Sequence, residues 1–386
     1  MARHIFTRDF ILICFAQMVF TTVFFALMPT LPLYLSRQGI REAEIGVLVG
    51  VFTVASLVMK PFVGRSLLRV PERKFLIAGS LVTAVCCMGY PVAPPFFPLF
   101  VLRTVQGIGF AFFFTAAFTW VFNRTPSAHH GEAVSYLYLA SNVATALAPA
   151  VGMFLINQFG FNVLFLGCAA FSLFSFFVTL RLRECEDAPV ESPPVKNQSF
   201  LNREALPLGI MGFVSNNIWG AMNAFFPLFA VSHGVANPGI VFTVFAAFLM
   251  LGRGFGGKIL DTYPKDKIVA PCLAAQMVAM ITLALSTTLP MFLVAGAILG
   301  MGNAFLYPVM MTSAIERAGV SRGPAVATFT AFTDLGTGTG AVLMGVIVEW
   351  TSYPTMFFCL ACMSLMNLFY FNFFVKKKGV EQYAHL

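Results

Sequence analysis

Apolar segments of about 20 residues, each long enough to cross the hydrocarbon core of a bilayer as a helix, recur along the whole 386-residue chain. No polar block between them is large enough to fold as a soluble domain. Only 10% of the residues are charged, against roughly 25% in ordinary soluble domains. Because the backbone polar groups of a chain in lipid must bond within the chain, these segments are expected to be helices. The sequence therefore predicts an all-α membrane protein.

Twelve membrane spans are predicted, at residues 9–34, 43–64, 74–92, 95–122, 131–157, 160–182, 206–232, 238–258, 266–287, 290–316, 322–350 and 353–375. If they alternate from an interior N-terminus, all but three of the 24 Lys and Arg residues fall on one side, which is then the cytoplasm. The net charge of +8 thus reports topology and not a nucleic-acid partner. We expect a multi-pass protein of the cell (inner) membrane, monomeric, with both termini cytoplasmic.

The sequence offers no signal for a metal site, a cofactor or an enzyme. Seven of the eight cysteines lie in apolar spans, so no disulfide framework is expected. His129, His130 and Glu132 lack a further ligand nearby, and no Ser-His-Asp, zincin or nucleotide-binding pattern occurs. The glycine-rich stretch GRGFGGK ends a predicted span and follows no strand, so it is interpreted as helix packing. No cofactor is expected.

A polar, acidic and proline-containing stretch divides the predicted spans into two sets of six. We interpret residues 183–205 as a cytoplasmic linker between an N-terminal six-helix bundle, residues 1–182, and a C-terminal one, residues 206–386.

The two bundles resemble each other in sequence at a constant shift of 193 residues. The shift places Lys60 over Arg253 and Gly107 over Gly300 without gaps. One register that serves several segments predicts a parallel internal repeat. Two such repeats in a membrane are typical of transporters that bind a solute near the bilayer midplane and work by alternating access.

The loop after the second span of each half carries a motif that resembles the major facilitator superfamily, and the resemblance extends over essentially the whole chain. Members share the plan of six plus six helices, and this loop usually reads like G-x-L-A-D-R-x-G-R-K. The second half has Gly257-Lys-Ile-Leu-Asp261, and the first half keeps Gly64 and Arg65 but has Leu68 in place of the aspartate. The resemblance implies that these residues gate conformation, the acid locking the outward-facing state.

The fourth span is similar to the R-x-x-Q-G-x-G-x-A motif of the proton-coupled antiporter branch of that superfamily. The matching residues are Arg103, Gln106, Gly107, Gly109 and Ala111. The fifth span resembles the antiporter element G-P-x-x-G-G in part, which implies a gating role for Pro149 and Gly152. Together these motifs imply a secondary transporter that exports its solute in exchange for protons.

Two charges, Arg103 and Asp334, are predicted to lie deep in the membrane. An arginine near a helix centre costs roughly 2.5–3.5 kcal/mol on insertion scales, so it is normally partnered or lines a wet cavity. The 193-residue shift places Gly296 over Arg103 and Ser141 under Asp334, so the repeated scaffold needs neither charge. We predict that both act in charge and proton coupling, since a carboxyl group in an apolar cavity takes up a proton readily. Purely structural contacts between helices are the alternative.

Further polar and aromatic side chains are predicted to line the solute cavity, and each is also suited to bonding helices together. They are Gln17, Gln106, Phe110, Asn142, Asn216, Asn217, Asn223, Asn303 and Tyr307. The resemblance favours Gln17, Asn217 and Asn303, because spans 1, 4, 7 and 10 line the cavity in the family. An aromatic, weakly polar cavity suits an amphipathic organic solute.

The leading hypothesis is therefore a secondary active transporter that exports a small organic or amphipathic molecule in exchange for protons. One alternative is a proton-coupled symporter or facilitator that imports an organic anion, with Arg103 as its charge clamp. A membrane enzyme or a receptor on the same scaffold is the alternative of a different class. Turnover of a substrate without a membrane gradient would distinguish it.

The two halves are expected to differ in the strength of the cytoplasmic lock, because Leu68 cannot accept the hydrogen bonds that Asp261 accepts. Asp261→Asn should therefore shift the conformational populations more than Leu68→Ala. Accessibility labelling of the two membrane faces measures this shift. Equal changes in the two variants would contradict the prediction.

Overall fold

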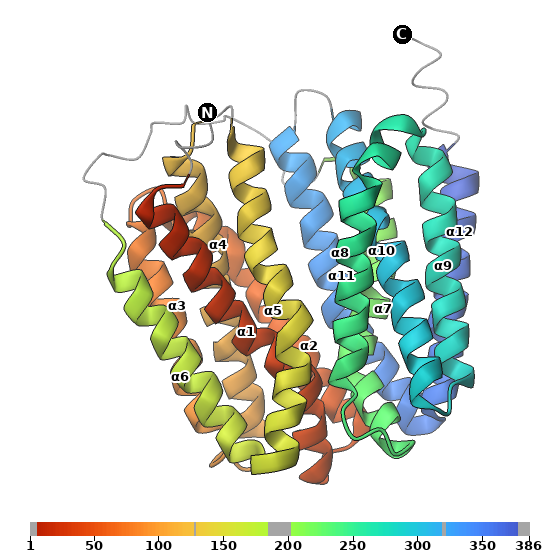
Figure 1. The fold of residues 1–386 in the computed structure, drawn as a ribbon, viewed down its shortest axis with the longest axis horizontal. Coiled ribbons are helices and arrows are strands. Elements are labelled where there is room, and N and C mark those ends of the chain that lie inside the picture. The colour runs from red at the N-terminus through yellow and green to blue at the C-terminus, as the bar shows by residue number, and fades with distance from the viewer. Residues whose placement is uncertain (1–5, 127–128, 184–201, 319–321, 377–386) are drawn as a thin grey trace. The chain divides into compact units, whose positions relative to one another are not determined.

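The computed structural model describes residues 6–126, 129–183, 202–318 and 322–376, and Figure 1 shows its ribbon. Within these ranges the regular elements are helices, and no strand occurs among them. The twelve α-helices are α1 (Arg8–Arg37), α2 (Glu42–Ser66), α3 (Glu72–Gly89), α4 (Phe97–Arg124), α5 (His130–Phe159), α6 (Phe161–Leu180), α7 (Leu206–Ser232), α8 (Gly239–Thr262), α9 (Lys265–Leu285), α10 (Leu289–Arg317), α11 (Arg322–Trp350) and α12 (Tyr353–Tyr370). A short π-helix, η3 (Phe371–Val375), extends α12. The predicted all-α fold of twelve helices is confirmed.

Nine helical segments in the described ranges are long and apolar enough to cross a membrane. The other three predicted spans are less apolar or less fully described. Helix α3 begins with the charged residues Glu72, Arg73 and Lys74, and α7 carries three asparagines. The described apolar part of α8, Gly239–Gly254, is short.

The contacts of the chain divide it into two units. The first comprises Met1–Ile40 and Val51–Val195, and the second comprises Arg41–Gly50 and Lys196–Leu386. The start of α2 thus groups with the C-terminal helices, which the sequence did not predict. The physical reason is close packing against α11, where the missing side chain of Gly50 admits the carbonyl oxygen of Gly338. The predicted linker, 183–205, lies mostly outside the described residues.

In the first unit, α1 packs against α4, α5 and α6, and α3 packs against α4 and α6. A core of large side chains joins these helices, including Phe10, Phe20, Phe113 and Trp120. The rings of Phe20 and Phe113 are stacked, with centroids 3.9 Å apart. This core lies beside the residues of the candidate site on α1 and α4.

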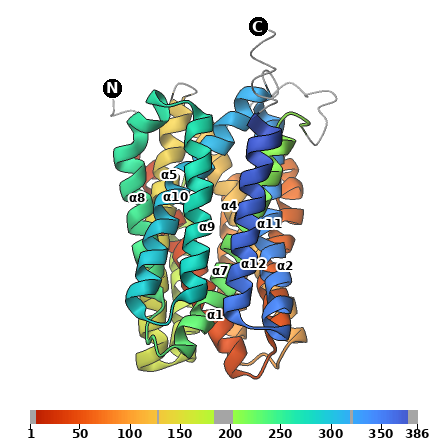
Figure 2. The ribbon, with the colours of Figure 1, turned by 90° about the vertical axis from the view of Figure 1, so that its right-hand side faces the viewer.

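In the second unit, α7 packs against α10, α11 and α12, and α10 packs against α8 and α9. Figure 2 shows α9 and α12 side by side. The core of this unit includes Met211, Leu273, Leu306 and Phe329. Helices at equivalent positions in the two units therefore pack against equivalent partners.

The repeat predicted from the sequence is confirmed in the contacts of single residues. A Cβ atom on Gly107 would meet the carbonyl oxygen of Phe52, and one on Gly300 would meet that of Phe245. Each residue of the first pair lies 193 positions before its counterpart in the second, as the numbering shows. Glycine is needed at both positions because the backbones of α2 and α4, and of α8 and α10, approach there.

A second contact repeats in the same way between α3 and α4 and between α9 and α10. A Cβ on Gly109 would lie 3.3 Å from the carbonyl oxygen of Gly79, and one on Gly302 would lie 3.2 Å from that of Cys272. A polar contact between the start of α3 and the end of α4 also recurs between α9 and α10, with different residues. Glu72 accepts a hydrogen bond from Asn123, and at the equivalent positions Lys265 pairs with Glu316.

We expect Gly107→Ala and Gly300→Ala each to destabilise the protein, because the new methyl group would force the packed helices apart. Overpacking of this kind costs about 1–3 kcal/mol. Gly167→Ala is the matched control, since a Cβ on Gly167 meets nothing within 4 Å and alanine is the better helix former. Thermal unfolding of the detergent-purified variants measures the effect. Equal stability of all three variants would refute the packing argument.

Candidate functional site

Helix α4 positions the buried cation of the first unit. Pro98 stands in the first turn of the helix, where its missing N–H costs nothing and its fixed φ favours the helical start. Arg103 follows in the second turn, and its side chain is only 7% exposed. Gln106 and Phe110 lie on the same face of α4, one and two turns further on.

The Arg103 guanidinium is held by a side-chain amide and an aromatic ring. Its Nη1 donates to Gln106 Oε1 at 2.9 Å, and its Cζ lies 4.5 Å from the centroid of the Phe52 ring. The same Gln106 oxygen accepts from the Tyr90 hydroxyl at 2.5 Å, while Gln106 Nε2 donates to Cys87 Sγ at 3.9 Å. Gln106 therefore ties α4 to α3 and fixes the guanidinium over an aromatic face, where cations are attracted.

The guanidinium lines a small, partly open cavity within the first unit. Helices α1, α2, α3 and α4 contribute its walls, which are Phe20, Val23, Phe24, Leu27, Phe52, Thr83, Arg103, Gln106 and Phe110. The rings of Phe24, Phe52 and Phe110 contact one another, with centroids 5.0–5.4 Å apart. The cavity is thus an aromatic box with one cation in its wall.

The structure brings the predicted residues Arg103, Gln106 and Phe110 to this cavity and places two others on neighbouring helices. Gln17 of α1 is completely buried, and its Nε2 donates to Ser141 Oγ of α5 at 3.1 Å. Asn142 follows Ser141 on α5 and is half-buried. Gln17 therefore bonds α1 to α5 next to the cavity and is not among the residues that line it.

The three asparagines of α7 in the second unit bond first to their own helix. Asn216, Asn217 and Asn223 each donate to the carbonyl oxygen four residues earlier, at 2.7–2.9 Å. The side-chain oxygens of Asn216 and Asn217 accept from Thr337 and Thr339 of α11, both at 3.4 Å. Asn217 is completely buried. The first two side chains thus lie in the contact between α7 and α11.

The remaining predicted cavity residues of the second unit are half-buried. Asn303 and Tyr307 lie one turn apart on α10, and the Tyr307 ring contacts that of Phe329 with centroids 5.3 Å apart. Asp334 lies on α11, one turn before Gly338. Its side chain is partly accessible.

The predicted gating residues lie at helix ends or between packed helices. Gly64 and Arg65 are exposed near the end of α2. Pro149 is buried on α5, and a Cβ on Gly152 would lie 3.2 Å from the carbonyl oxygen of Ala26 on α1. Gly257 and Asp261 belong to the part of α8 whose side chains lie outside the described set.

Of the residues that line the cavity, sequence reasoning identified only Arg103, Gln106 and Phe110. Phe52 of α2 contacts Arg103, and Tyr90, the residue after α3, contacts Gln106. Thr83 of α3 lines the same cavity. The packing of these helices brings the three residues to the site. Thr83 is 4% exposed, and its hydroxyl has no hydrogen-bond partner within the described residues. Thr83 and Ser80 are the polar residues in the middle of α3, and such polar positions were the available signal.

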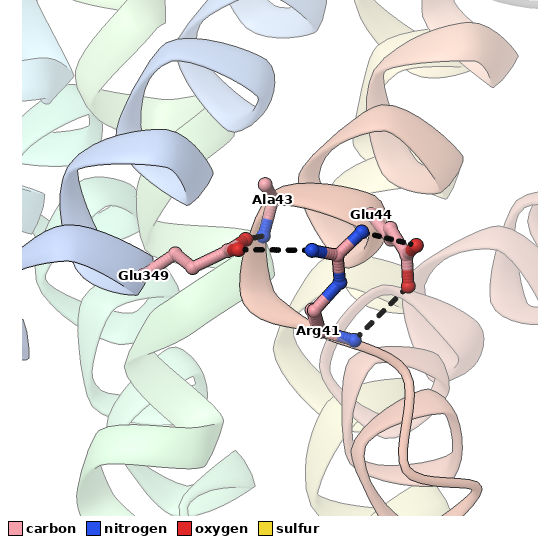
Figure 3. A network of polar contacts seen from close by, with 4 residues as sticks. All are labelled: Arg41, Ala43, Glu44 and Glu349. Carbon is pink, nitrogen blue, oxygen red and sulfur yellow. Dashed lines mark hydrogen bonds and ion pairs between the residues drawn. The ribbon is translucent and has the colours of Figure 1, made fainter.

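A second polar network, in the second unit, was also not foreseen. Figure 3 shows Glu349 of α11 facing the start of α2, where it accepts from the backbone N–H of Ala43 at 3.1 Å. Arg41 lies 3.5 Å from Glu349 and 2.9 Å from Glu44. The contacts with Glu44 raise the pKa of the Arg41 guanidinium above its ordinary value. The network fastens the first turn of α2 to the end of α11.

Two proteins with similar sequences align with most of this chain. It is 26% identical over 379 residues to the staphylopine export protein of Staphylococcus aureus (strain Mu50 / ATCC 700699), covering 93% of this chain and 94% of that protein. It is 23% identical over 334 residues to an uncharacterized MFS-type transporter of Burkholderia pseudomallei (strain 1106a), covering 84% and 81%.

Solved structures share the fold at lower identity. A mutant of the nucleoside transporter NupG matches with a TM-score of 0.81 at 16% identity, covering 95% of this chain and 100% of that one. A POT family transporter in complex with a thioalcohol-conjugated peptide matches with a TM-score of 0.80 at 12% identity, covering 96% of each chain. The family model of the Major Facilitator Superfamily matches residues 13–238 and 208–384. With twelve helices in two repeats and a family match over most of its length, this transporter belongs to the Major Facilitator Superfamily.

Proposed function

We propose that this transporter exports a small amphipathic organic molecule by alternating access, in exchange for protons. The solute class is supported by the cavity of the first unit, where Arg103 lies in a wall of phenylalanine rings. This is the observation that carries the proposal, because a buried cation in a transporter is costly unless it serves a ligand or a coupling step. The direction is supported by similarity to an export protein over 93% of the chain.

In the proposed cycle the two charges that depart from the repeat have separate tasks. Arg103 binds the solute from the first unit, and Asp334 of the second unit holds the coupling proton. The solute binds more tightly when Asp334 is ionised, and protonation of Asp334 favours release of the solute. We place the protein in the cell (inner) membrane as a monomer with both termini in the cytoplasm, as the distribution of Lys and Arg favours.

The second candidate is import of an organic anion by a proton symporter or facilitator. The observation that favours it is the same buried guanidinium, because the planar fork of arginine is suited to clamping a carboxylate. The two candidates differ in the sign of the coupling between solute and proton. A flux measurement with an imposed gradient distinguishes them.

The antiport proposal predicts that a strain without this protein accumulates a solute or becomes sensitive to it. An untargeted comparison of metabolites inside and outside cells identifies that solute. In proteoliposomes, an imposed proton gradient should then drive the solute opposite to the proton, and a protonophore should abolish accumulation. Equal transport with no gradient and no proton movement would refute exchange, and movement of both in one direction would support symport.

Asp334→Asn should separate binding from coupling, because the amide mimics the protonated carboxyl group and cannot ionise. We expect the variant to retain solute binding with an affinity that no longer changes with pH, and to lose proton-driven accumulation. Expression level, binding and coupled flux are measured on the same preparations. Glu204→Gln, which removes an exposed carboxylate before α7, is the control. Normal coupled flux in Asp334→Asn would remove this residue from the mechanism.

A further inference from the structure

We infer that the cavity at Arg103 binds the carboxylate of an amphipathic organic acid. Arg103 and Thr83 donate to the carboxylate, and the rings of Phe24, Phe52 and Phe110 enclose the apolar part of the acid. This inference rests on the proposed function, since it names the chemical class of the solute for that transporter, and exchange for protons requires in addition that the acid carry a cationic group. Four features of the cavity support it.

The first feature is the sign of the charge. Among the described residues that line the cavity, Arg103 alone carries a formal charge. The other walls are mostly apolar, so the surroundings screen this charge poorly and the potential in the cavity is positive. A guanidinium presents its N–H donors in a planar fork that matches the two oxygens of a carboxylate.

The second feature is the Thr83 hydroxyl, which faces the same cavity from α3. Some buried hydroxyls in helices of this unit donate to the carbonyl four residues earlier, as Ser80 and Thr30 do at 2.9 and 2.7 Å. Those of Ser56, Thr83 and Ser172 make no hydrogen bond within the described residues, and of these three only Thr83 lines the cavity. Thr83 is 4% exposed, and its Oγ1 makes no hydrogen bond within the described residues. Buried polar groups without a partner are rare and unfavourable, and an anionic oxygen in the cavity would satisfy this one.

The third feature is the way in which Gln106 is oriented. Its side-chain oxygen would repel a carboxylate, but that oxygen accepts from both Arg103 Nη1 and the Tyr90 hydroxyl. Both acceptor sites of the amide oxygen are therefore occupied by protein donors. Gln106 and Tyr90 act as positioning residues that hold the guanidinium, and the donors of Arg103 and Thr83 meet the ligand.

The fourth feature is the aromatic wall, which restricts the rest of the ligand. Phe24, Phe52 and Phe110 offer apolar faces with centroids 5.0–5.4 Å apart. A strongly hydrated inorganic anion, such as phosphate or sulfate, would lose its water there without compensation. A monocarboxylate attached to a flat or apolar body gains from both parts of the cavity.

The test is equilibrium binding to the full-length protein in phosphatidylcholine nanodiscs, with no gradient. The probes are benzoate, phenylacetate and 2-naphthoate, each paired with its neutral amide. At least one acid is expected to bind about tenfold more tightly than its amide, as for a hydrogen-bonded charge in place of a neutral group. If no acid binds better than its amide, the inference is overturned.

Variants then assign the preference to this cavity. Thr83→Val conserves shape and removes the hydroxyl, so it should weaken acid binding about tenfold. Thr30→Val removes a buried hydroxyl that bonds within its own helix, and it should leave binding unchanged. Arg103→Gln should abolish the acid preference, and Arg103→Lys should retain part of it because the charge persists. Equal binding by the two threonine variants would overturn the inference even if Arg103→Gln does not fold.

Competition with decanoate distinguishes a transported acid from a fatty acid of the membrane. If decanoate binds at Arg103 and none of the three soluble acids displaces it, the site holds a lipid and the solute assignment is wrong. Because binding is measured without a gradient, the result does not depend on the direction or coupling of transport. Loss of proton-driven flux would refute the proposed function and leave an acid preference at Arg103 intact.

Discussion

Close approach of helix backbones at glycine is the constraint on which both the scaffold and the candidate site depend. Lipid tails are as apolar as leucine, so helices in a bilayer associate through tight packing more than through the hydrophobic effect. Gly107 brings α4 against the carbonyl oxygen of Phe52 on α2. That approach places the Phe52 ring 4.5 Å from the Arg103 guanidinium, four residues earlier on α4. One packing contact therefore joins two helices and forms one wall of the cavity.

The second unit shows what the same scaffold does with a glycine at the position equivalent to Arg103. Gly300 meets Phe245 there as Gly107 meets Phe52, but the position equivalent to Arg103 is Gly296. Gln276 occupies the position equivalent to Thr83, and its side-chain oxygen accepts from Ser364 of α12 at 3.4 Å. The polar group on α9 is thus satisfied within its unit, whereas the hydroxyl on α3 faces a cavity. The fold therefore does not require an unpartnered polar group at this position. The difference between the two units supports a role in ligand binding for the first one.

The sequence predicted those parts of the structure that follow from periodicity and left open those that depend on packing between helices. The twelve helices and the 193-residue repeat follow from apolar length and self-comparison, and the shared face of Arg103, Gln106 and Phe110 follows from helical spacing. Thr83 and Tyr90 meet this face through the rotation of α3, which no spacing along the chain encodes. For the same reason the sequence did not distinguish Asn217, which lies in the contact between α7 and α11, from a residue that faces a cavity.

If this transporter exchanges its solute for protons as proposed, the sign of the coupling between solute and proton limits which acids it exports. By linkage, a proton changes solute affinity by the same factor as the solute changes proton affinity. If Asp334 holds the coupling proton as proposed, a solute whose only charge is a carboxylate would favour the protonated form of this group, and solute and proton would then move together. Exchange needs a solute that binds more tightly when Asp334 is ionised, and a cationic group on the solute supplies that preference. Proton-driven export of an acid bound at Arg103 therefore requires a zwitterion, whereas a simple organic anion is suited to symport.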